Sequence, residues 1–310
     1  MKTMNRSVFC VTAFIFCVMV LLLAHCLAPK KQKNTLTIVA TTSIIADTVR
    51  QLVGDNVQVY ALMGPGVDPH LYRAREGDVH RLAEADIIFY NGLHLEGKMG
   101  HVLEGMNRFT RSVAVADGID KSLLRQADFE GLYDPHIWFD VSLWVAVTRY
   151  IADTVIVVDP EHAEYYKMRS DEYIQRLIGL DAYIKQQIAT IAPENRILVT
   201  AHDAFGYFGR AYGMRVVGLQ GLSTDSEISM KDVQELATFI VDNKIRAIFV
   251  ESSIPQRTLV AVQNAVAARG WSVALGDELY SDALGDPDSL AGTYYDMVKH
   301  NVDAIVHGLR

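Results

Sequence analysis

The chain has 310 residues, of which 50% are hydrophobic and 21% charged, and it carries a formal net charge of −8. At about 100–200 residues per domain, this length allows about two globular domains. The apolar content excludes a disordered or collagen-like chain. The acidic balance argues against a broad nucleic-acid-binding surface, which needs an excess of Lys and Arg.

Cysteine is confined to the start of the chain. The three cysteines are Cys10, Cys17 and Cys26, and no cysteine follows them. Disulfides, cysteine nucleophiles and thiolate metal sites are therefore excluded from residues 27–310.

The first 26 residues are typical of an export signal. Lys2 and Arg6 precede an uncharged run at 7–24, and a positive segment followed by an apolar stretch is the pattern of a bacterial secretory signal. The run has 18 residues, which is the lower limit for spanning a bilayer. A cleaved signal and a retained anchor therefore both stay open.

The end of this segment, Leu23-Ala24-His25-Cys26, resembles a lipobox, in which the cysteine receives a diacylglycerol, although His25 replaces the usual Gly, Ala or Ser. We predict a periplasmic or otherwise extracytoplasmic protein. It is anchored to the bacterial inner membrane either by a lipid on Cys26 or by an uncleaved signal segment at 1–26. Residues 27–35 are predicted to be a polar tether.

From residue 36, short β-rich runs alternate with helical stretches, which is the pattern of parallel-sheet α/β domains. A helix at 43–53, capped by Ser43 and ended by Gly54, is expected after the first strand, and the apolar stretch 144–158 is predicted to be a buried helix. Residues 36–159 should form a first α/β lobe. Its strands are expected at 36–40, 57–62, 87–90 and 112–115.

The stretch 160–189 differs from the rest. It opens with Asp159-Pro160, an N-cap followed by proline at the first helical position, and contains a single glycine. About 30 residues at 1.5 Å per residue predict a helix of about 45 Å. Such a helix is either a coiled-coil-like surface helix or a rigid strut between two lobes. We favour the strut and assign 160–192 to a linking helix.

Beyond this helix the alternation of strands and helices restarts, so residues 193–310 should form a second α/β lobe. Strands are expected at 197–200, 216–219, 247–250 and 272–275, and helices near 230–243, 255–269 and 293–308. The predicted fold class is α/β, with two parallel-sheet lobes joined by one long rigid backbone helix.

The motifs of the commonest hydrolytic enzymes are missing. The patterns G-x-x-x-x-G-K-[ST], G-x-S-x-G and H-E-x-x-H do not occur in the sequence. Their absence removes ATP hydrolysis by a P-loop and the usual serine-hydrolase and zinc-protease signatures. We expect that the chain is not an enzyme.

Histidine carries the strongest functional signal. Asp68-Pro69-His70 and Asp134-Pro135-His136 repeat one tripeptide in predicted loops, and His202 follows the strand at 197–200. A neighbouring carboxylate is suited to accept the spare imidazole N–H, as in metal sites, and ligands gather at the carboxyl ends of parallel strands. Each histidine taken alone is more often a surface or capping residue, but the repeated tripeptide favours a shared site.

Three histidines without a thiol need a fourth ligand or an open position. Successive members of the set are 66 residues apart, which is too wide for a zinc finger, so the site would be assembled by tertiary folding. Carboxylates at predicted strand ends are the natural fourth ligand, and the spacing leaves four of them open: Glu251, Asp277, Glu278 and Asp282.

Several motifs together resemble the zinc/manganese-binding solute-binding proteins of ABC importers (cluster A-I). Besides the first tripeptide they are DPHIWFD at 134–140, AHDAFGYF at 201–208, LSTDSE at 222–227, VESS at 250–253 and LYSDALG at 279–285. The resemblance covers residues 36–309. It implies one metal ion between two lobes, held by His70 and His136 from the first and by His202 and Asp282 from the second. Glu251 would then support a ligand or the fold.

The resemblance also implies a function. The chain would be an extracytoplasmic receptor that captures one Zn²⁺ or Mn²⁺ and delivers it to an ABC permease with a separate ATPase subunit. We expect a monomer that binds no nucleic acid and meets the membrane through its N-terminal segment alone.

The sequence departs from the family pattern in places that bear on metal choice. Residues 71–76 lack the prolines that commonly follow the first motif, and 118–133 lacks the histidines that many zinc-uptake members carry there. Members tuned to manganese usually have a carboxylate where His202 stands. The chain lies between these patterns, so both Zn²⁺ and Mn²⁺ stay open.

Two other functions would use the same residues: a zinc-dependent hydrolase, which keeps a coordination position open, and a surface adhesin whose metal stabilises the fold. For the receptor we expect four ligands that close the site and an affinity that falls as the pH drops through about 6.5. We also expect small lobe or loop shifts on loading, because the long helix limits hinge opening.

Overall fold

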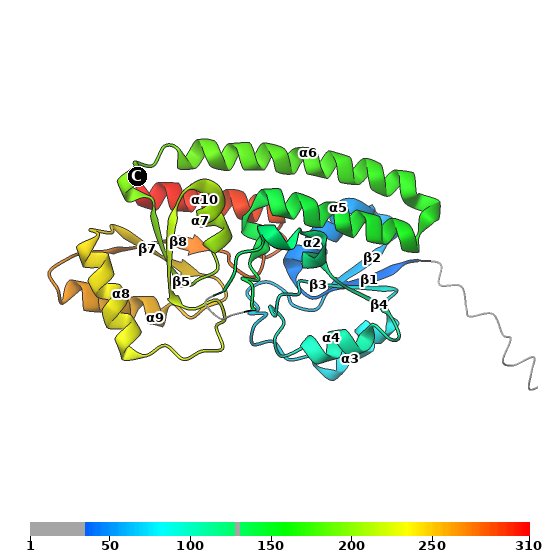
Figure 1. The fold of residues 1–310 in the computed structure, drawn as a ribbon, viewed down its shortest axis with the longest axis horizontal. Coiled ribbons are helices and arrows are strands. Elements are labelled where there is room, and N and C mark those ends of the chain that lie inside the picture. Colours follow the sequence, from blue (N-terminus) through cyan, green and yellow to red (C-terminus); the bar gives the residue numbers. More distant parts are fainter. Residues whose placement is uncertain (1–34, 128–130) are drawn as a thin grey trace, which may run out of the picture. The chain divides into compact units, whose positions relative to one another are not determined.

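Two four-stranded parallel sheets occur in the described residues, 35–127 and 131–310, of this computed structural model (Figure 1). The predicted signal segment 1–26 and residues 27–34 of the tether lie outside the described residues. The first sheet contains β1 (Thr37–Ala40), β2 (Gln58–Ala61), β3 (Ile87–Tyr90) and β4 (Arg111–Ala114), in the order β2-β1-β3-β4. The second contains β5 (Ile197–His202), β6 (Arg215–Gln220), β7 (Ala247–Glu251) and β8 (Ala274–Leu279), in the order β6-β5-β7-β8. The predicted α/β class with two parallel sheets is confirmed.

One strand, β8, differs from the prediction in its position. The apolar residues predicted a strand at 272–275, whereas β8 spans Ala274–Leu279. This strand pairs with β7 from Ala247↔Ala274 to Glu251↔Leu279. Five of its six residues are at least partly exposed, so polar side chains lie inside the strand. Because the prediction followed hydrophobicity, it ended too early.

The helix after β1, α2 (Ser43–Val53), ends at Gly54 as predicted, where a φ of 63° suits glycine. Its cap, however, is Thr42 and not Ser43. Thr42 Oγ1 accepts the N–H of Ile45 at 3.3 Å. Ser43 Oγ accepts the N–H of Leu284 at 2.9 Å, and it therefore joins the start of α2 to a loop near the end of the chain.

The long helix is α6 (Ala163–Ile188), which follows a 3₁₀ turn at Pro160–His162, so the α-helix begins three residues later than predicted. Its 26 residues span about 39 Å. It packs on α2 and on α5 (Val141–Val158) beside the first sheet and on α10 (Tyr294–Leu309) beside the second (Figure 1). The predicted linking of two lobes by one long helix is confirmed.

The remaining helices complete the layers around the sheets. They are α3 (Glu76–Glu84), α4 (Gly100–Met106), α7 (Gly206–Tyr212), α8 (Met230–Asp242) and α9 (Arg257–Ala267). No helix was predicted at α7, because its seven residues contain two glycines and three aromatic side chains and show no helical period. By length and composition α5 is the one helix of the described residues that could cross a membrane, but half of it is buried in the protein. Its position matches the predicted buried helix.

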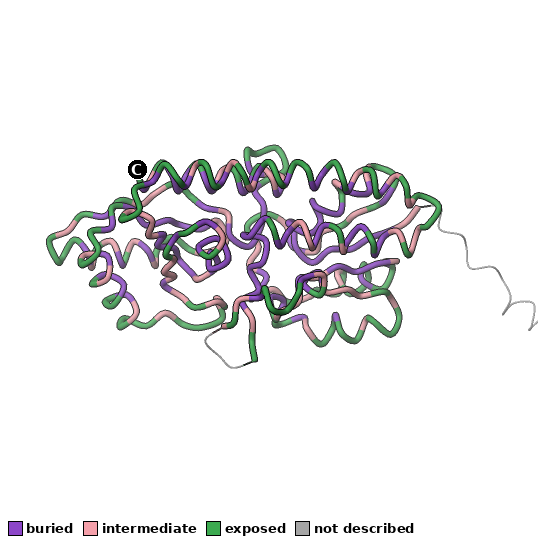
Figure 2. The backbone as a smooth tube through the Cα atoms, turned by 45° about the horizontal axis from the view of Figure 1, so that its top comes forward, coloured by how far each residue is buried: buried purple, intermediate pink, exposed green. Residues whose placement is uncertain are grey.

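One hydrophobic core cluster extends into both halves, beside a smaller cluster in each half. A single cluster of buried side chains contains Ile38 and Phe89 from the first sheet, Leu198 and Phe249 from the second, and Leu180 from α6. Figure 2 shows buried backbone in both halves beneath the long helix. A shared core of this kind opposes a large hinge motion, because opening would expose apolar surface to water.

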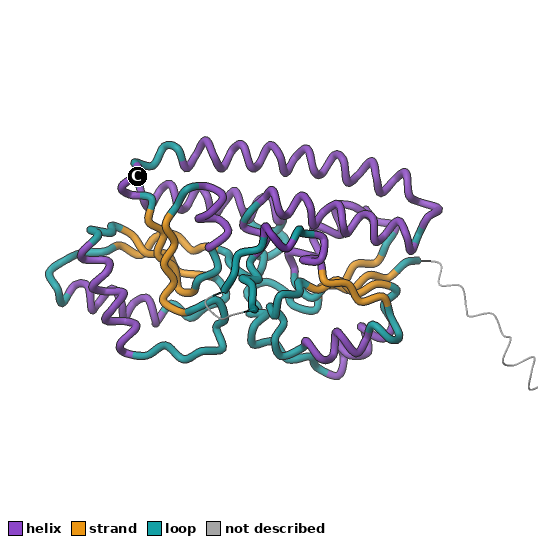
Figure 3. The backbone as a smooth tube through the Cα atoms, in the orientation of Figure 1, coloured by secondary structure: helices purple, strands orange, loops and turns teal. Residues whose placement is uncertain are grey.

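The loops between strands and helices gather between the two sheets (Figure 3). In parallel sheets the loops that follow the carboxyl ends of the strands are where ligands bind. His70, His136, His202, Glu251 and Asp282 lie in these loops or at the strand ends that lead into them, whereas Asp277 and Glu278 lie inside β8.

Candidate metal centre

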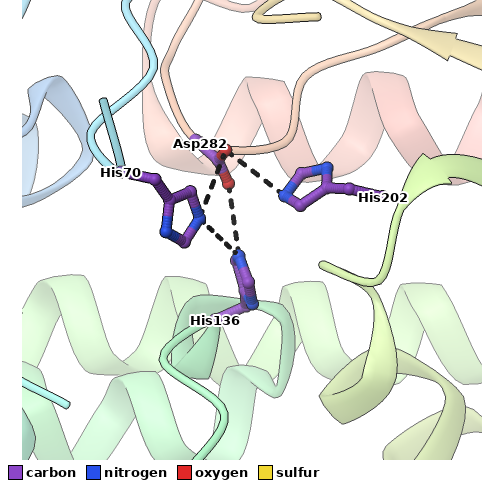
Figure 4. A group of neighbouring side chains, drawn as sticks. All are labelled: His70, His136, His202 and Asp282. Atoms are coloured by element: carbon purple, nitrogen blue, oxygen red, sulfur yellow. Dashed lines mark hydrogen bonds and ion pairs between the residues drawn. The ribbon is translucent and has the colours of Figure 1, made fainter. Parts of the chain in front are cut away.

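Four buried side chains, each from a different segment of the chain, meet at one point between the sheets (Figure 4). His70 lies in the loop after β2, and His136 directly precedes a short 3₁₀ turn at Ile137–Phe139. His202 is the last residue of β5, and Asp282 follows β8. One ligand atom from each lies within 4.8 Å of all the others. The structure thus brings together the four residues named from the sequence.

The spacing of these atoms fits a single tetrahedral ion. His70 Nε2 lies 3.3 Å from His136 Nε2 and 3.9 Å from Asp282 Oδ2. Asp282 Oδ1 lies 3.6 Å from His136 Nε2, and Asp282 Oδ2 lies 3.4 Å from His202 Nε2. A tetrahedron with metal–ligand bonds of about 2.1 Å has edges of about 3.4 Å. The group could hold a metal ion without a large rearrangement.

Asp282 provides the clearest sign that a cation belongs here. Its side chain is buried, and neither carboxylate oxygen accepts a hydrogen bond. A buried carboxylate without donors is costly unless a cation or a proton compensates it. Three imidazole nitrogens lie 3.4–3.9 Å from its oxygens.

Carboxylates behind two of the histidines hold their rings in place. Asp134 Oδ1 lies 2.8 Å from His136 Nδ1 and also accepts the backbone N–H of His136 at 3.0 Å. Glu251 Oε2 lies 2.6 Å from His202 Nδ1, and Glu251 Oε1 accepts the backbone N–H of His202 at 2.9 Å. Each carboxylate occupies Nδ1 and so leaves Nε2 directed at the centre. Glu251 thus contacts a histidine and is not a member of the cluster.

His70 is held in a different way from the one predicted. Asp68 Oδ1 accepts the backbone N–H of His70 at 2.8 Å, which is an Asx turn, and does not contact the ring. Asp68 Oδ2 accepts a hydrogen bond from Thr224 Oγ1 at 2.6 Å. Thr224 lies in the loop after β6, so the two lobes are joined beside the cluster. Lys98 and Asp225 make a second such contact at 2.6 Å.

The loop that carries Asp282 is fixed to the first lobe on both sides. Trp138 Nε1 donates to the carbonyl of Ser281 at 2.9 Å, and Ser43 accepts from Leu284 as described above. The other carboxylates left open by the spacing lie elsewhere. Asp277 contacts His307 at 3.1 Å on the surface, and the carbonyl of Glu278 lies 3.0 Å from His300 Nε2.

The electrostatics of the group follow from its burial. Burial lowers the pKa of His70 to about 3, so that imidazole is neutral. Burial opposes ionisation of Asp282, but the three histidines outweigh it and hold its pKa below the usual range. For His202, burial opposes the charged form, yet Glu251 and Asp282 raise its pKa well above the usual value. These two carboxylates therefore favour the charged form of His202.

A cavity of about 310 Å³ adjoins the cluster on the side of His70. Its lining is mainly apolar and includes Leu93, Leu132 and Leu222. His94 also lines this cavity and is not part of the cluster. Of the four members of the cluster, His70 alone lines this cavity.

Comparison with known proteins identifies the family of this chain. The family model ZnuA, described as "Zinc-uptake complex component A periplasmic", matches residues 38–308. The zinc-binding protein TroA of Treponema pallidum is 48% identical over 272 residues, covering 88% of each chain. The manganese-binding lipoprotein MntA of Bacillus subtilis is 44% identical over 283 residues, covering 91% of this chain and 92% of MntA. The chain is thus similar over most of its length to a zinc-binding and to a manganese-binding protein.

A further relative and a solved structure agree with this. The manganese ABC transporter substrate-binding lipoprotein PsaA of Streptococcus mitis is 29% identical over 307 residues, covering 96% of this chain and 98% of PsaA. The structure of periplasmic zinc-binding TroA from Treponema pallidum matches with a TM-score of 0.87, covering 89% of this chain and 99% of TroA. TroA and MntA are named as metal-binding proteins, and PsaA is named as a substrate-binding lipoprotein of a manganese ABC transporter. The chain therefore belongs to the ZnuA family.

Proposed function

We propose that this chain is the extracytoplasmic receptor of an ABC importer and that it captures one Zn²⁺ or Mn²⁺ with His70, His136, His202 and Asp282. The observation that carries the proposal is the buried Asp282 carboxylate, which accepts no hydrogen bond and faces three imidazole nitrogens at 3.4–3.9 Å. Family membership supplies the transport role, since PsaA is named a substrate-binding lipoprotein of an ABC transporter. A permease and a separate ATPase subunit would receive and import the ion.

The donor set favours zinc in affinity and tolerates manganese. Imidazole nitrogen suits Zn²⁺, carboxylate oxygen suits Mn²⁺, and zinc binds more tightly than manganese at a given nitrogen and oxygen site. The names of the relatives cover both ions, with TroA zinc-binding and MntA manganese-binding. We propose that Zn²⁺ binds more tightly and that availability decides which ion is carried.

The geometry supports capture and speaks against catalysis. Four protein ligands fill a tetrahedral site, whereas catalytic zinc keeps one position for water or substrate. All four side chains are buried, which suits an enclosed ion. None of the relatives named above supports a hydrolase or an adhesin, and we therefore retain the receptor hypothesis.

The organisation of the chain completes the proposal. We assign residues 36–159 and 193–310 to two lobes and 160–192 to the linking segment. Because the lobes share a core and α6 packs on both, release of the ion should involve the loops beside the cluster and not a wide hinge. MntA and PsaA are named lipoproteins, which supports membrane anchoring, by a lipid on Cys26 or by an uncleaved segment. We propose that the receptor acts as a monomer.

Metal uptake by the purified chain tests the function. The protein is stripped with a chelator, dialysed, and titrated with Zn²⁺ and Mn²⁺ separately, and bound metal is measured by mass spectrometry of the elements. We expect one equivalent of either ion, with zinc bound more tightly. Asp282→Ala should weaken the affinity for this equivalent by about 100-fold, while Asp277→Ala, which removes an exposed carboxylate, should leave the affinity unchanged. Uptake of neither ion, or an affinity that Asp282→Ala does not lower, would refute the proposal.

A further inference from the structure

One arginine outside the cluster touches carboxylates that adjoin two of its histidines. Arg125 Nη1 lies 2.6 Å from Asp134 Oδ2, and Arg125 Nη2 lies 3.2 Å from Asp203 Oδ2. Asp134 is fully buried, and its other oxygen is the one that contacts His136 Nδ1. Asp203 directly follows His202. The Arg125 guanidinium thus connects Asp134, which contacts His136 in the first lobe, with Asp203, which follows His202 in the second.

The second lobe is shaped to receive this arginine. A Cβ atom at Gly206 would lie 1.8 Å from Arg125 Nη1 and 2.3 Å from its Cζ, so a larger residue would displace the guanidinium. The hydroxyl of Tyr207 accepts the backbone N–H of Arg125 at 2.9 Å and donates to the carbonyl of Asp134 at 3.0 Å. Three residues of the motif AHDAFGYF that cannot reach an ion therefore contact Arg125 or its partner.

The backbone strengthens the same link. The N–H of Asp134 donates to the carbonyl of Arg125 at 2.9 Å, so the two residues are paired through both main chain and side chain. An arginine that binds two carboxylates through its rigid fork fixes both in orientation, which a lysine cannot do. The orientation of Asp134 in turn determines the direction of the His136 ring.

We propose that Arg125 is a positioning residue for the bound ion: by holding Asp134 and Asp203 together, it sets the orientation of His136 and the place of His202, and hence the affinity and coordination geometry. This inference rests on the proposed function of the cluster as a metal site. It assigns to Arg125 an effect on the metal beyond its contribution to lobe packing.

Arg210 offers a matched control, because it joins the same segments without reaching the cluster. Its Nη1 donates to the carbonyl of Leu123 at 2.7 Å, its guanidinium lies 4.9 Å from the centre of the Tyr207 ring, and its Nη2 lies 3.6 Å from Asp140. Among the described residues, none of these three partners has a side-chain contact with a histidine of the cluster. A role limited to lobe packing would give the two arginines similar effects.

The test compares Arg125→Gln, Arg125→Lys and Arg210→Gln with the unaltered chain. Zn²⁺ affinity is measured by competition with a chromophoric chelator, and Co²⁺ is added as a spectroscopic probe whose visible absorption reports the ligand geometry. Thermal unfolding of the metal-free proteins shows how much each change destabilises the fold. We expect Arg125→Gln to weaken Zn²⁺ binding by about tenfold or more and to change the Co²⁺ spectrum. Arg210→Gln should keep both.

The remaining outcomes are also decisive. Arg125→Lys should give an intermediate affinity and an altered spectrum, since an ammonium group pairs one carboxylate at a time, and this variant decides the matter if Arg125→Gln does not fold. Unaltered affinity and spectrum in the Arg125 variants, or an equal loss in Arg210→Gln, would overturn the inference. Failure of the unaltered chain to bind Zn²⁺ or Mn²⁺ would instead overturn the proposed function.

Discussion

Replacing His202 by alanine removes a proposed metal ligand that lies close to two buried carboxylates. The change deletes the Nε2 atom 3.4 Å from Asp282 Oδ2 and the Nδ1 atom 2.6 Å from Glu251 Oε2. The Glu251 side chain stays buried, and its carboxylate keeps the hydrogen bond from the backbone N–H of residue 202 at 2.9 Å. Residues that merely support a ligand cost about 10–100-fold in metal affinity when they are changed. Loss of the ligand itself should cost about 100–1,000-fold, or about 3–4 kcal/mol.

The assay for His202→Ala is competition between the protein and a chelator of known zinc affinity. His80→Ala is the control, because His80 lies on α3 with 72% of its side chain exposed and pairs with Glu84. Thermal unfolding of the metal-free proteins separates a lost ligand from a lost fold. A zinc affinity for His202→Ala within about threefold of that of the unaltered chain would refute the reasoning, since removal of a metal ligand should lower the affinity by much more.

Four further predictions follow from the same geometry. Glu251→Gln keeps the shape of the side chain but removes the charge beside His202, and zinc affinity measured by calorimetry should fall by about tenfold. The pKa of His202 is raised, so this residue is protonated without metal, whereas His70 has a pKa of about 3 and is already neutral. Zinc binding at pH 7 should therefore release about one proton, and the zinc affinity should fall as the pH falls. Calorimetry in two buffers of different ionisation enthalpy measures the proton release, and release of no proton would contradict the prediction. Removing the metal should lower the unfolding temperature, since an ion at 1,000 times its Kd stabilises the fold by about 4.1 kcal/mol, and scanning calorimetry with and without chelator checks it. Thr224→Val removes the 2.6 Å hydrogen bond to Asp68. Its loss, about 1 kcal/mol, should speed zinc dissociation by about fivefold in a stopped-flow chase with excess chelator. An unchanged dissociation rate would show that this contact does not limit release of the ion.

The strands and the long helix could be predicted from the sequence because their signals are local. Short β-rich runs between helical stretches gave all eight described strands, with errors of a few residues at their ends. The largest error was β8, where Asp277 and Glu278 lie inside a strand that is partly exposed. Hydrophobicity marks buried strands and misses the part of an edge strand that faces water.

The histidines of the cluster could be predicted because the repeated Asp-Pro-His tripeptide is rare enough to indicate a shared role. The fourth member could not be chosen from spacing, since Asp277, Glu278 and Asp282 all follow the same predicted strand. The turn after β8 decides among them: it buries Asp282 and leaves Asp277 on the surface. That outcome depends on contacts with Trp138 and Ser43, far away in the sequence.

The supporting contacts were predictable only in part. A carboxylate on the ring of a histidine was expected for both tripeptides, and it occurs at Asp134 but not at Asp68. Both aspartates accept the N–H two residues later, which the tripeptide does specify locally. Arg125 gave no local signal at all, because its two carboxylates lie 9 and 78 residues away. The expectation of an affinity that falls near pH 6.5 also assumed an ordinary histidine, and burial removes His70 from that range.

The most direct test of the metal site is a crystal of the protein loaded with Zn²⁺, with diffraction data collected on both sides of the zinc absorption edge. We predict one anomalous peak, surrounded by the Nε2 atoms of His70, His136 and His202 and a carboxylate oxygen of Asp282 at about 2.0–2.2 Å. A peak at another place, such as the exposed pair of His307 and Asp277, with none among these four side chains, would contradict the account.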